Sequence, residues 1–253
     1  MTQSSGGKSI VGWIAIGVAA IVSTWIAASA WERVKMKPAD RIIQVTGSAK
    51  KQIVSDQIEW TASLQTQNMD RTAAYRDLHQ NVQAALSYLK EQGIKEDDIR
   101  PGSVVVNEIR KTEYVGTGEN RIEREVFKGY STTQQISVIS NDVARIERIS
   151  REISQLLERG VPITSVPPNY YYTKLGELKI QMLAEAAKDA RVRGESIVKE
   201  AGSAVLGKLR NADMGVINVN PVNSTETSWE GRNDTSTLEK DIITIIHATF
   251  ELN

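Results

Sequence analysis

Few residues have the types and spacing needed for chemistry, and a glycine-rich segment is the first of them. Residues 202–208, GSAVLGK, match the start of a phosphate-binding loop, in which backbone N–H groups would cradle phosphate oxygens. Leu209 stands where such a loop needs Ser or Thr to bind Mg²⁺. The segment also follows a predicted helix instead of opening one, so no helix N-terminus is aimed at a phosphate. We interpret it as a helix end that leads into a strand.

The sequence contains few residues that could bind a metal ion or act as a nucleophile. The only histidines are His79 and His247, and we interpret each as structural or surface because neither has a partner evident in the sequence. With no cysteine, disulfides, thiolate nucleophiles and cysteine zinc sites are excluded. The acidic run 96–98 lacks the spacing of a calcium loop, and no G-x-S-x-G serine motif occurs. We therefore predict no catalytic residue, no metal and no cofactor.

The balance of charges also limits the possible partners. Lys plus Arg and Asp plus Glu both total 31, which gives a formal net charge of zero. Nucleic-acid binders usually carry a basic excess or a basic stripe, so we predict no nucleic-acid partner.

An uncharged stretch, residues 9–31, dominates the N-terminal part of the chain. Residues 10–30 would form a helix roughly 31 Å long, about the thickness of a bilayer's hydrocarbon core. Trp13 and Trp31 lie near its two ends, where indole rings favour the membrane–water interface. We predict a transmembrane signal anchor over residues 9–31 that contacts the lipid bilayer.

A stripe of small residues runs along this predicted helix. Ala15, Ala19, Ser23 and Ala27 recur every four residues, a spacing that would let a second helix pack closely. Simple alanine richness is the alternative explanation.

A cleaved signal peptide is the main alternative to the anchor. Lys8 supplies a short positive region, and residues 28–30, Ala-Ser-Ala, have the form of a cleavage site. The apolar run is longer than the 7–15 residues of a usual signal peptide, which favours the anchor. We predict that residues 1–8 form a short cytoplasmic head, that residues 32–40 form a linker, and that the rest lies outside the cytoplasm.

Hydrophobic periodicity places strands and helices along the rest of the chain. Strands are predicted over 42–47, 53–67, 100–112, 127–140, 161–173, 206–219 and 241–252, and helices over 70–92, 141–159 and 175–201. In the strand 53–67, alternate residues are predicted to lie on a buried face: Ile58, Trp60, Ala62 and Leu64. The residues predicted to face inward are Ala74, Leu78, Val82, Ala85 and Leu89 in the first helix, Val143, Ile146, Ile149, Ile153 and Leu157 in the second, and Leu178, Met182, Ala186, Ala190, Ile197 and Ala201 in the third. Residues 113–125 are predicted to form an exposed hairpin tip. The predicted fold class is α+β: the N-terminal transmembrane helix is followed by antiparallel sheets with three packed helices. Two β-β-α passages come first, then a strand, the long helix and C-terminal strands.

Two polar or aromatic segments are candidates for binding a small ligand or a peptide. They are the loop 220–237, rich in Asn, Ser and Thr, and the run Tyr170-Tyr171-Tyr172. Side chains alternate along a strand, so at least one of the three tyrosines is expected to face solvent. Ordinary packing is the alternative, because aromatic residues are favoured in strands.

Several sequence segments, in a fixed order, resemble those of one protein family. They are IIQVTGSAKKQIVSDQIEWTASLQT, LKEQGIKEDDIRPGSVVV, GYSTTQQISVISNDVARI, LAEAAKDARVRGESIVKEAG followed by LGKL, and the closing ATFELN. In this order and spacing, residues 41–253 resemble the SIMPL-domain family of bacterial envelope proteins, which includes the periplasmic immunogenic protein. The long apolar stretch suggests a membrane-anchored subgroup.

The resemblance implies a fold, a location and a mode of assembly. It implies an α+β domain over residues 41–253, a periplasmic or envelope location, large homo-oligomers and no assigned enzymatic activity. Together with the anchor, it places the protein as single-pass in the bacterial inner membrane with the large domain in the periplasm. A cleaved, periplasmic or secreted form is the alternative.

The leading functional hypothesis is a non-enzymatic, membrane-tethered envelope protein that assembles with copies of itself. Exposed strand edges with unpaired backbone groups would be one physical route to that assembly. The alternatives are a periplasmic module that binds a small ligand or a peptide, and an envelope hydrolase that uses carboxylates not adjacent in the sequence.

Overall fold

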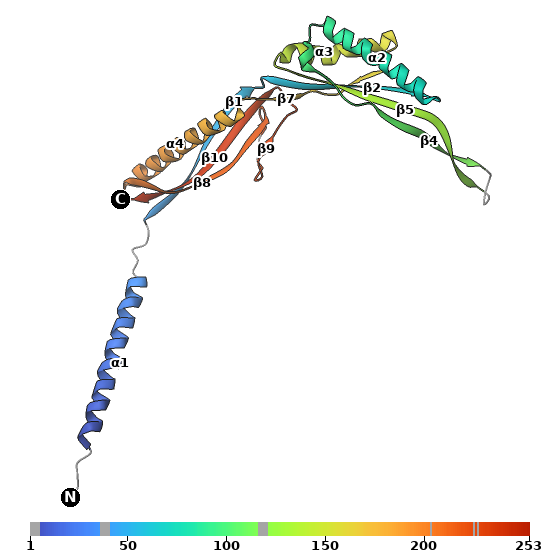
Figure 1. Cartoon of the computed structure of the whole chain (residues 1–253). Helices are drawn as coiled ribbons and strands as arrows, with labels where there is room; N and C mark the ends of the chain where they lie inside the picture. The colour runs from blue at the N-terminus through green and yellow to red at the C-terminus, as the bar shows by residue number, and fades with distance from the viewer. Residues whose placement is uncertain (1–5, 36–40, 116–120, 203, 225, 227) are drawn as a thin grey trace. The chain divides into compact units, whose positions relative to one another are not determined.

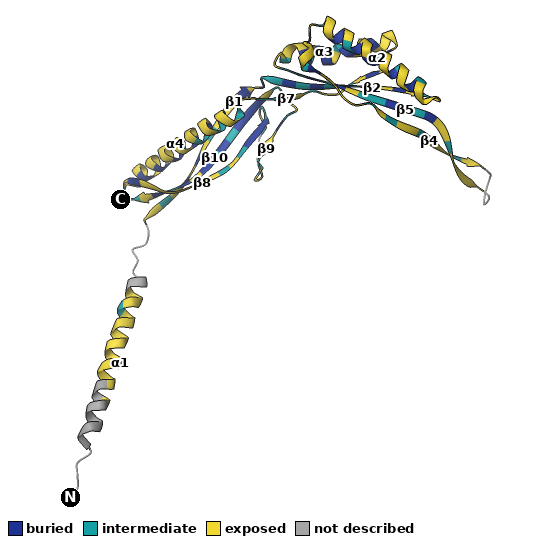
Figure 2. Cartoon of the chain, viewed as in Figure 1, coloured by how far each residue is buried: buried dark blue, intermediate teal, exposed yellow. Residues whose placement is uncertain are grey.

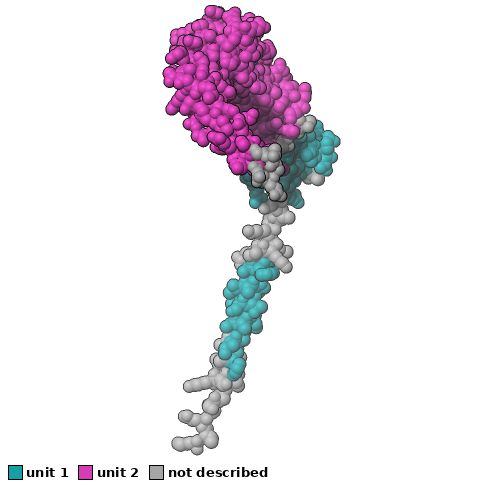
Figure 3. Space-filling view, turned by 90° about the vertical axis from the view of Figure 1, so that its right-hand side faces the viewer, with its two compact units in different colours: residues 1–47, 188–213, 247–253 teal, residues 48–187, 214–246 magenta. Residues whose placement is uncertain are grey.

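A computed structural model describes residues 6–35, 41–115, 121–202, 204–224, 226 and 228–253, with side chains of the first helix described at Trp13 and at 16–32. The chain divides into two compact units (Figure 3). One contains residues 1–47, 188–213 and 247–253, and the other contains residues 48–187 and 214–246.

The order of elements is that of an α+β chain (Figure 1), as predicted. The helices are α1 (Gly6–Lys35), α2 (Arg71–Glu91), α3 (Val143–Glu152) and α4 (Leu175–Ala201), with two 3₁₀ segments, Glu96–Asp98 and Ile153–Arg159. The strands are β1 (Ile42–Val54), β2 (Gln57–Asn68), β3 (Ile99–Pro101), β4 (Val105–Val115), β5 (Ile122–Ser140), β6 (Ile163–Ser165), β7 (Asn169–Tyr171), β8 (Leu206–Pro221), β9 (Arg232–Asn233) and β10 (Glu239–Leu252).

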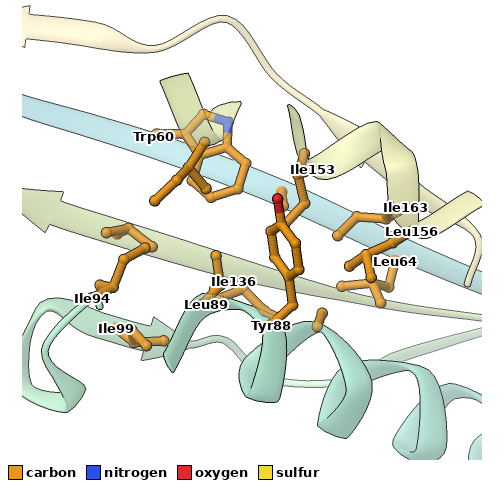
Figure 4. Close-up of a cluster of buried hydrophobic side chains, with 14 of the residues drawn as sticks. Trp60, Leu64, Tyr88, Leu89, Ile94, Ile99, Ile136, Ile153, Leu156 and Ile163 are labelled. Atoms are coloured by element: carbon orange, nitrogen blue, oxygen red, sulfur yellow. The ribbon is translucent and has the colours of Figure 1, made fainter. Parts of the chain in front are cut away.

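The larger core lies between a six-stranded sheet and the helices α2 and α3. The sheet has the order β3-β5-β2-β6, with β4 also on β5 and β7 also on β2, and all of these pairs are antiparallel. Both helices lie on the same face of the sheet (Figure 1). Trp60, Leu64 and Ile136 from the strands meet Leu89 and Ile153 from the helical side (Figure 4). This is the alternation predicted for β2, with one face buried.

Helix α2 forms where its cap and its apolar spacing predict. The Asp70 side chain accepts a hydrogen bond from the Ala73 N–H at 2.7 Å, which satisfies one of the free donors of the first turn. Gly93, with φ of +79°, follows the last turn in the left-handed conformation that glycine adopts easily. The buried residues are the predicted stripe, together with one tyrosine: Ala74, Leu78, Val82, Ala85, Tyr88 and Leu89.

The second predicted helix changes its geometry halfway, and one predicted core residue is wrong as a result. Asp142 caps α3, accepting a hydrogen bond from the Arg145 N–H. From Ile153 the chain continues as a 3₁₀ segment, which has three residues per turn instead of 3.6. The next buried residue is therefore Leu156, and Leu157, predicted to point inward, is 54% exposed.

Helix α4 packs on the four-stranded sheet, whose order is β1-β10-β8-β9. In the larger unit, Leu178 and Met182 contact Ile53 and Ile242. In the smaller unit, Gly194 lies so close to the sheet that an added Cβ would be 3.2 Å from Leu206.

The inward stripe of α4 follows a strict four-residue spacing. Its buried members are Leu178, Met182, Ala186, Ala190 and Val198. Ile197 and Ala201, both predicted to face inward, are exposed, because Gly194 and then Val198 continue the spacing.

Several strand boundaries differ from the prediction, and the predicted strands 100–112 and 161–173 are each divided in two, into β3 and β4 and into β6 and β7. Strand β1 runs on to Val54, and the break before β2 falls at Ser55 and Asp56 instead of residues 48–52. Tertiary contacts make this turn: the Ser55 N–H donates to the Leu238 carbonyl, and the Asp56 carboxylate accepts two bonds from Thr173, each 2.7 Å long. One short pair, β8 with β9, is parallel, so the sheets are not purely antiparallel.

Candidate functional site

The residues predicted to form a membrane anchor all lie on α1. Trp13 is 73% exposed and Trp31 is 67% exposed. Ala19, Ser23 and Ala27 are exposed as well, whereas the Ala15 side chain lies outside the described residues. Within the part of the chain that the structure describes, no helix is both long enough and apolar enough to span a membrane. The anchor and its packing stripe therefore stay predictions.

The other sequence candidates occupy ordinary positions. His79 is exposed and stacks on Tyr75, and His247 is exposed with its Nδ1 3.1 Å from the Thr46 hydroxyl. Gly202 ends α4 with φ of +75°, and the chain enters β8 at Leu206, as interpreted from the sequence. Among the described residues, no cluster of three His, Asp or Glu side chains is arranged to hold a metal ion.

The structure brings together the tyrosine run and the polar loop, which are about sixty residues apart in the chain. The Tyr170 N–H donates to the Thr235 carbonyl at 2.7 Å, and the Thr235 hydroxyl donates to the Asn169 side chain. Tyr170 is buried, and Tyr171 and Tyr172 are half-buried, so none of the three is fully exposed. The Tyr171 hydroxyl instead donates to the Glu59 carboxylate at 3.1 Å.

A buried lysine, Lys240, lies at the centre of this arrangement. It is 2% exposed, and its ammonium group donates to the Tyr170 carbonyl at 2.9 Å and to the Asp234 carbonyl. The Asp234 carboxylate is 3.9 Å away. Burial lowers the pKa of Lys240, and the charge of Asp234 acts against that shift. The lysine joins the loop to β7 and β10.

Hydrogen bonds hold Asp234 in its ionised form. Thr237 and Ser236 donate to its carboxylate from both their hydroxyl and backbone N–H groups. Burial by itself would raise the pKa of this carboxyl, but these bonds and the charge of Lys240 outweigh it and lower the pKa. The neighbouring Asp241 has a lowered pKa because Lys50, 2.9 Å away, and the Asn223 N–H both donate to it.

The space beside Lys240 is small. A cavity of about 60 Å³ is lined by Tyr170, Tyr171, Tyr172 and Lys240, with Ile53, Leu175, Val219 and Asn233. Pockets for drug-sized ligands begin at about 300 Å³. The network is therefore built to fasten the loop 220–237 to the sheet, and it has room only for something the size of water or a small ion.

The sequence contains a signal for this lysine, although the lysine belongs to no known motif. Along β10, the period of two that buries Ile242, Thr244 and Ile246 also places residue 240 on the inward face. A lysine at such a position needs acceptors, and here they come from segments distant in the chain.

Acid should weaken the fold through these two carboxylates. Both pKa values are lower in the folded chain than the unfolded value of about 3.9, so their stabilisation is complete above that pH and is lost as the pH falls through the folded values. Lys240 is protonated in both states in acid and adds no slope there. We expect the melting temperature, followed by circular dichroism, to fall below about pH 4. An Asp234→Asn variant should show a shallower fall, and a melting temperature that stays flat to pH 3 would contradict this account.

A second candidate site is the ribbon arm, defined as residues 109–115 of β4 and 122–129 of β5. Strand β2 ends at Asn68, opposite Tyr130, so the arm beyond that point is two strands wide (Figure 1). At the base, Gly129 has φ of +118°, and a Cβ there would lie 2.7 Å from the Asn68 carbonyl oxygen. Strands β4 and β5 run well past the predicted boundaries, since the sequence places a hairpin tip over 113–125.

The arm exposes apolar side chains while pairing many of its charges. Tyr114, Val115 and Ile122 are 55%, 59% and 69% exposed, and nearly the whole arm is open to solvent (Figure 2). Arg110 bonds Glu108 at 2.9 Å, and Lys128 bonds Glu113 at 2.7 Å. A two-stranded ribbon is marginally stable alone, and further strands or a helix normally cover such a surface. The arm therefore has the character of an association surface.

Residues 43–240 match the family model SIMPL, described as a protein of unknown function (DUF541). No curated protein matches the chain. The matched region contains the ribbon arm and ends at Lys240.

Proposed function

The chain belongs to the SIMPL family, and we propose that this member is a membrane-tethered protein of the cell envelope that assembles with copies of itself. The single observation that carries the proposal is the ribbon arm, because its exposed apolar residues and open strands have no covering element in the described chain. In this role α1 holds the protein at the membrane, and the rest of the chain associates.

The support for the tether comes from α1. Residues 10–30 contain no charged side chain, and a helix of that length is about 31 Å long. Between residues 16 and 32 every side chain is exposed except the half-buried Ser29. Apolar residues all round a helix need an apolar environment, and a bilayer supplies one. The tether would also raise the local concentration of the chains and so favour assembly.

The proposed role is not enzymatic. The support is that the buried charged side chains with shifted pKa values all have structural roles. Asp234, Asp241 and Lys240 are the buried charged side chains of the described residues, and each is engaged in hydrogen bonds that fasten the loop to the sheet. Groups engaged in this way are not available to a substrate. The location proposed is the inner membrane, with the large domain in the periplasm.

Washing membranes with alkaline carbonate tests the tether. We expect the full-length protein to stay in the membrane fraction, and an Ile21→Arg variant to be released in part, because a central arginine costs about 2.5–3.5 kcal/mol on insertion. An Ile180→Arg variant is the matched control, since Ile180 is exposed on α4. Release of the unaltered protein by the wash would rule out the tether.

A small-ligand site is the second candidate function. One observation favours it, namely that the tyrosine run and the polar loop meet around the cavity beside Lys240. Its size restricts the ligand to a small ion or molecule. Thermal-shift measurements with simple anions and envelope metabolites test this role, because any ligand that binds only the folded state raises the melting temperature. No shift with any of them would count against it.

A further inference from the structure

We propose that β4 pairs, antiparallel, with β4 of a second copy of this chain about a two-fold axis at Ile109. This inference rests on the proposed self-association and names the surface that carries it.

Strand β4 has a free and regular edge. Among the described strands it pairs with β5 alone, so backbone groups along residues 105–115 point outward without a partner strand. The ladder shifts between Ile109 and Arg110, and the extra residue, Lys128, is on β5. Strand β4 itself therefore has no bulge, and it contains no proline, so two common devices that block edge pairing are absent from it.

Two-fold symmetry restricts the register of such a pair. The axis residue of one copy faces itself in the other, and residues equally far on either side of the axis face each other. An axis at Glu108, Arg110, Lys111 or Glu113 would place like charges about 5 Å apart, which is unfavourable. Axes at the uncharged residues avoid this, and of these the one at Ile109 pairs the longest part of β4, residues 105–113.

The axis at Ile109 gives complementary partners along the strand. Glu108 of each copy faces Arg110 of the other, and Ile109 faces itself. Within one chain Arg110 already donates to Glu108 through Nε and Nη2, and their side chains are 57% and 49% exposed. The pairing converts these two bonds into a ring of four alternating charges. Further out, Asn107 faces Lys111 and Val106 faces Thr112, so no like charges meet.

The pairing would also stabilise the arm. Residues 109–113 of each arm then lie along residues 105–109 of the other copy, so the arm becomes part of a sheet wider than the two strands that are marginal alone. The half-buried Ile109 becomes the centre of the new ladder. Cross-strand pairs of this kind are the unit that stabilises a sheet.

Single cysteines test the register cleanly, because the chain has none of its own. In full-length protein in detergent under mild oxidation, Ile109→Cys should give a disulfide-linked dimer on non-reducing gels. Thr112→Cys and Val115→Cys are the matched controls on the same strand. Their sulfurs would lie about 20 Å and 40 Å apart in the dimer, beyond the reach of a disulfide. Cross-linking at 112 or 115 as efficient as at 109 would overturn the axis.

Charge reversal gives an independent measurement. An Arg110→Glu variant should weaken self-association at least about tenfold, since two like-charge pairs replace two attractive ones. The Glu108→Arg, Arg110→Glu double variant restores the ring and should restore association. If the unaltered protein is a monomer, the proposed function fails with this inference. If the unaltered protein assembles, but neither the cysteine cross-linking nor the charge-reversal variants show that assembly depends on β4, only this inference fails.

Discussion

Replacing Trp60 with alanine should lower the free energy of unfolding by about 3–5 kcal/mol. Trp60 is fully buried in the larger core (Figure 4). Its indole N–H donates to the Ser165 hydroxyl at 2.9 Å, and that hydroxyl donates to the Ser150 carbonyl at 2.6 Å. The substitution removes a large apolar volume and the first bond of this chain of hydrogen bonds. Urea unfolding followed by circular dichroism measures the loss.

Trp229 provides a control of the same residue type. It is 93% exposed, so Trp229→Ala should change the unfolding free energy by no more than about 0.5 kcal/mol. A Trp60→Phe variant keeps most of the ring volume and should fall between the two. Equal losses at positions 60 and 229 would contradict the burial of Trp60 in the core between the six-stranded sheet and its helices.

Replacing Lys240 with methionine should cost about 3–5 kcal/mol, although the shape of the side chain is nearly kept. The change leaves the Tyr170 and Asp234 carbonyls without their donor and leaves the buried Asp234 carboxylate without its cation. Breaking a buried ion pair from one side is costly because the remaining charge stays desolvated. Thermal and urea unfolding of the variant measure this loss.

Two variants identify the cause of that loss. Lys51→Met removes an exposed lysine whose only described contact is a 3.4 Å bond to Gln181, and it should change little. Adding Asp234→Asn to Lys240→Met removes the orphaned charge, so the double variant should be more stable than Lys240→Met alone. If the double variant loses the sum of both single losses, the two groups do not form a unit.

Periodicity predicted the regular elements well where one geometry continued throughout. Helix α4 has the predicted bounds, and β2 buries the predicted alternate residues. The prediction for Leu157 is wrong because the helix changes to a 3₁₀ helix at Ile153, and the spacing of apolar residues does not indicate such a change. Ile197 was misplaced because glycine at 194 continues the inward stripe without being apolar.

The two candidate sites were predictable to different degrees. The loop 220–237 and the tyrosine run were both visible in the sequence, but their meeting was not, since Lys240 and Tyr170 are brought together by the tertiary fold. The length of the ribbon arm was underestimated because residues 113–125 are charged and lack the alternation of a half-buried strand. A ribbon with both faces open has no buried face to set that alternation.

Native mass spectrometry of the full-length protein, extracted from membranes in detergent, tests the central claim most directly. The measurement reports the length of each chain and the number of copies together. The proposal predicts assemblies whose mass is a multiple of an uncleaved chain of 28.0 kDa. A mass of one chain at micromolar concentration would contradict self-assembly, and chains shortened by residues 1–30 would contradict the tether.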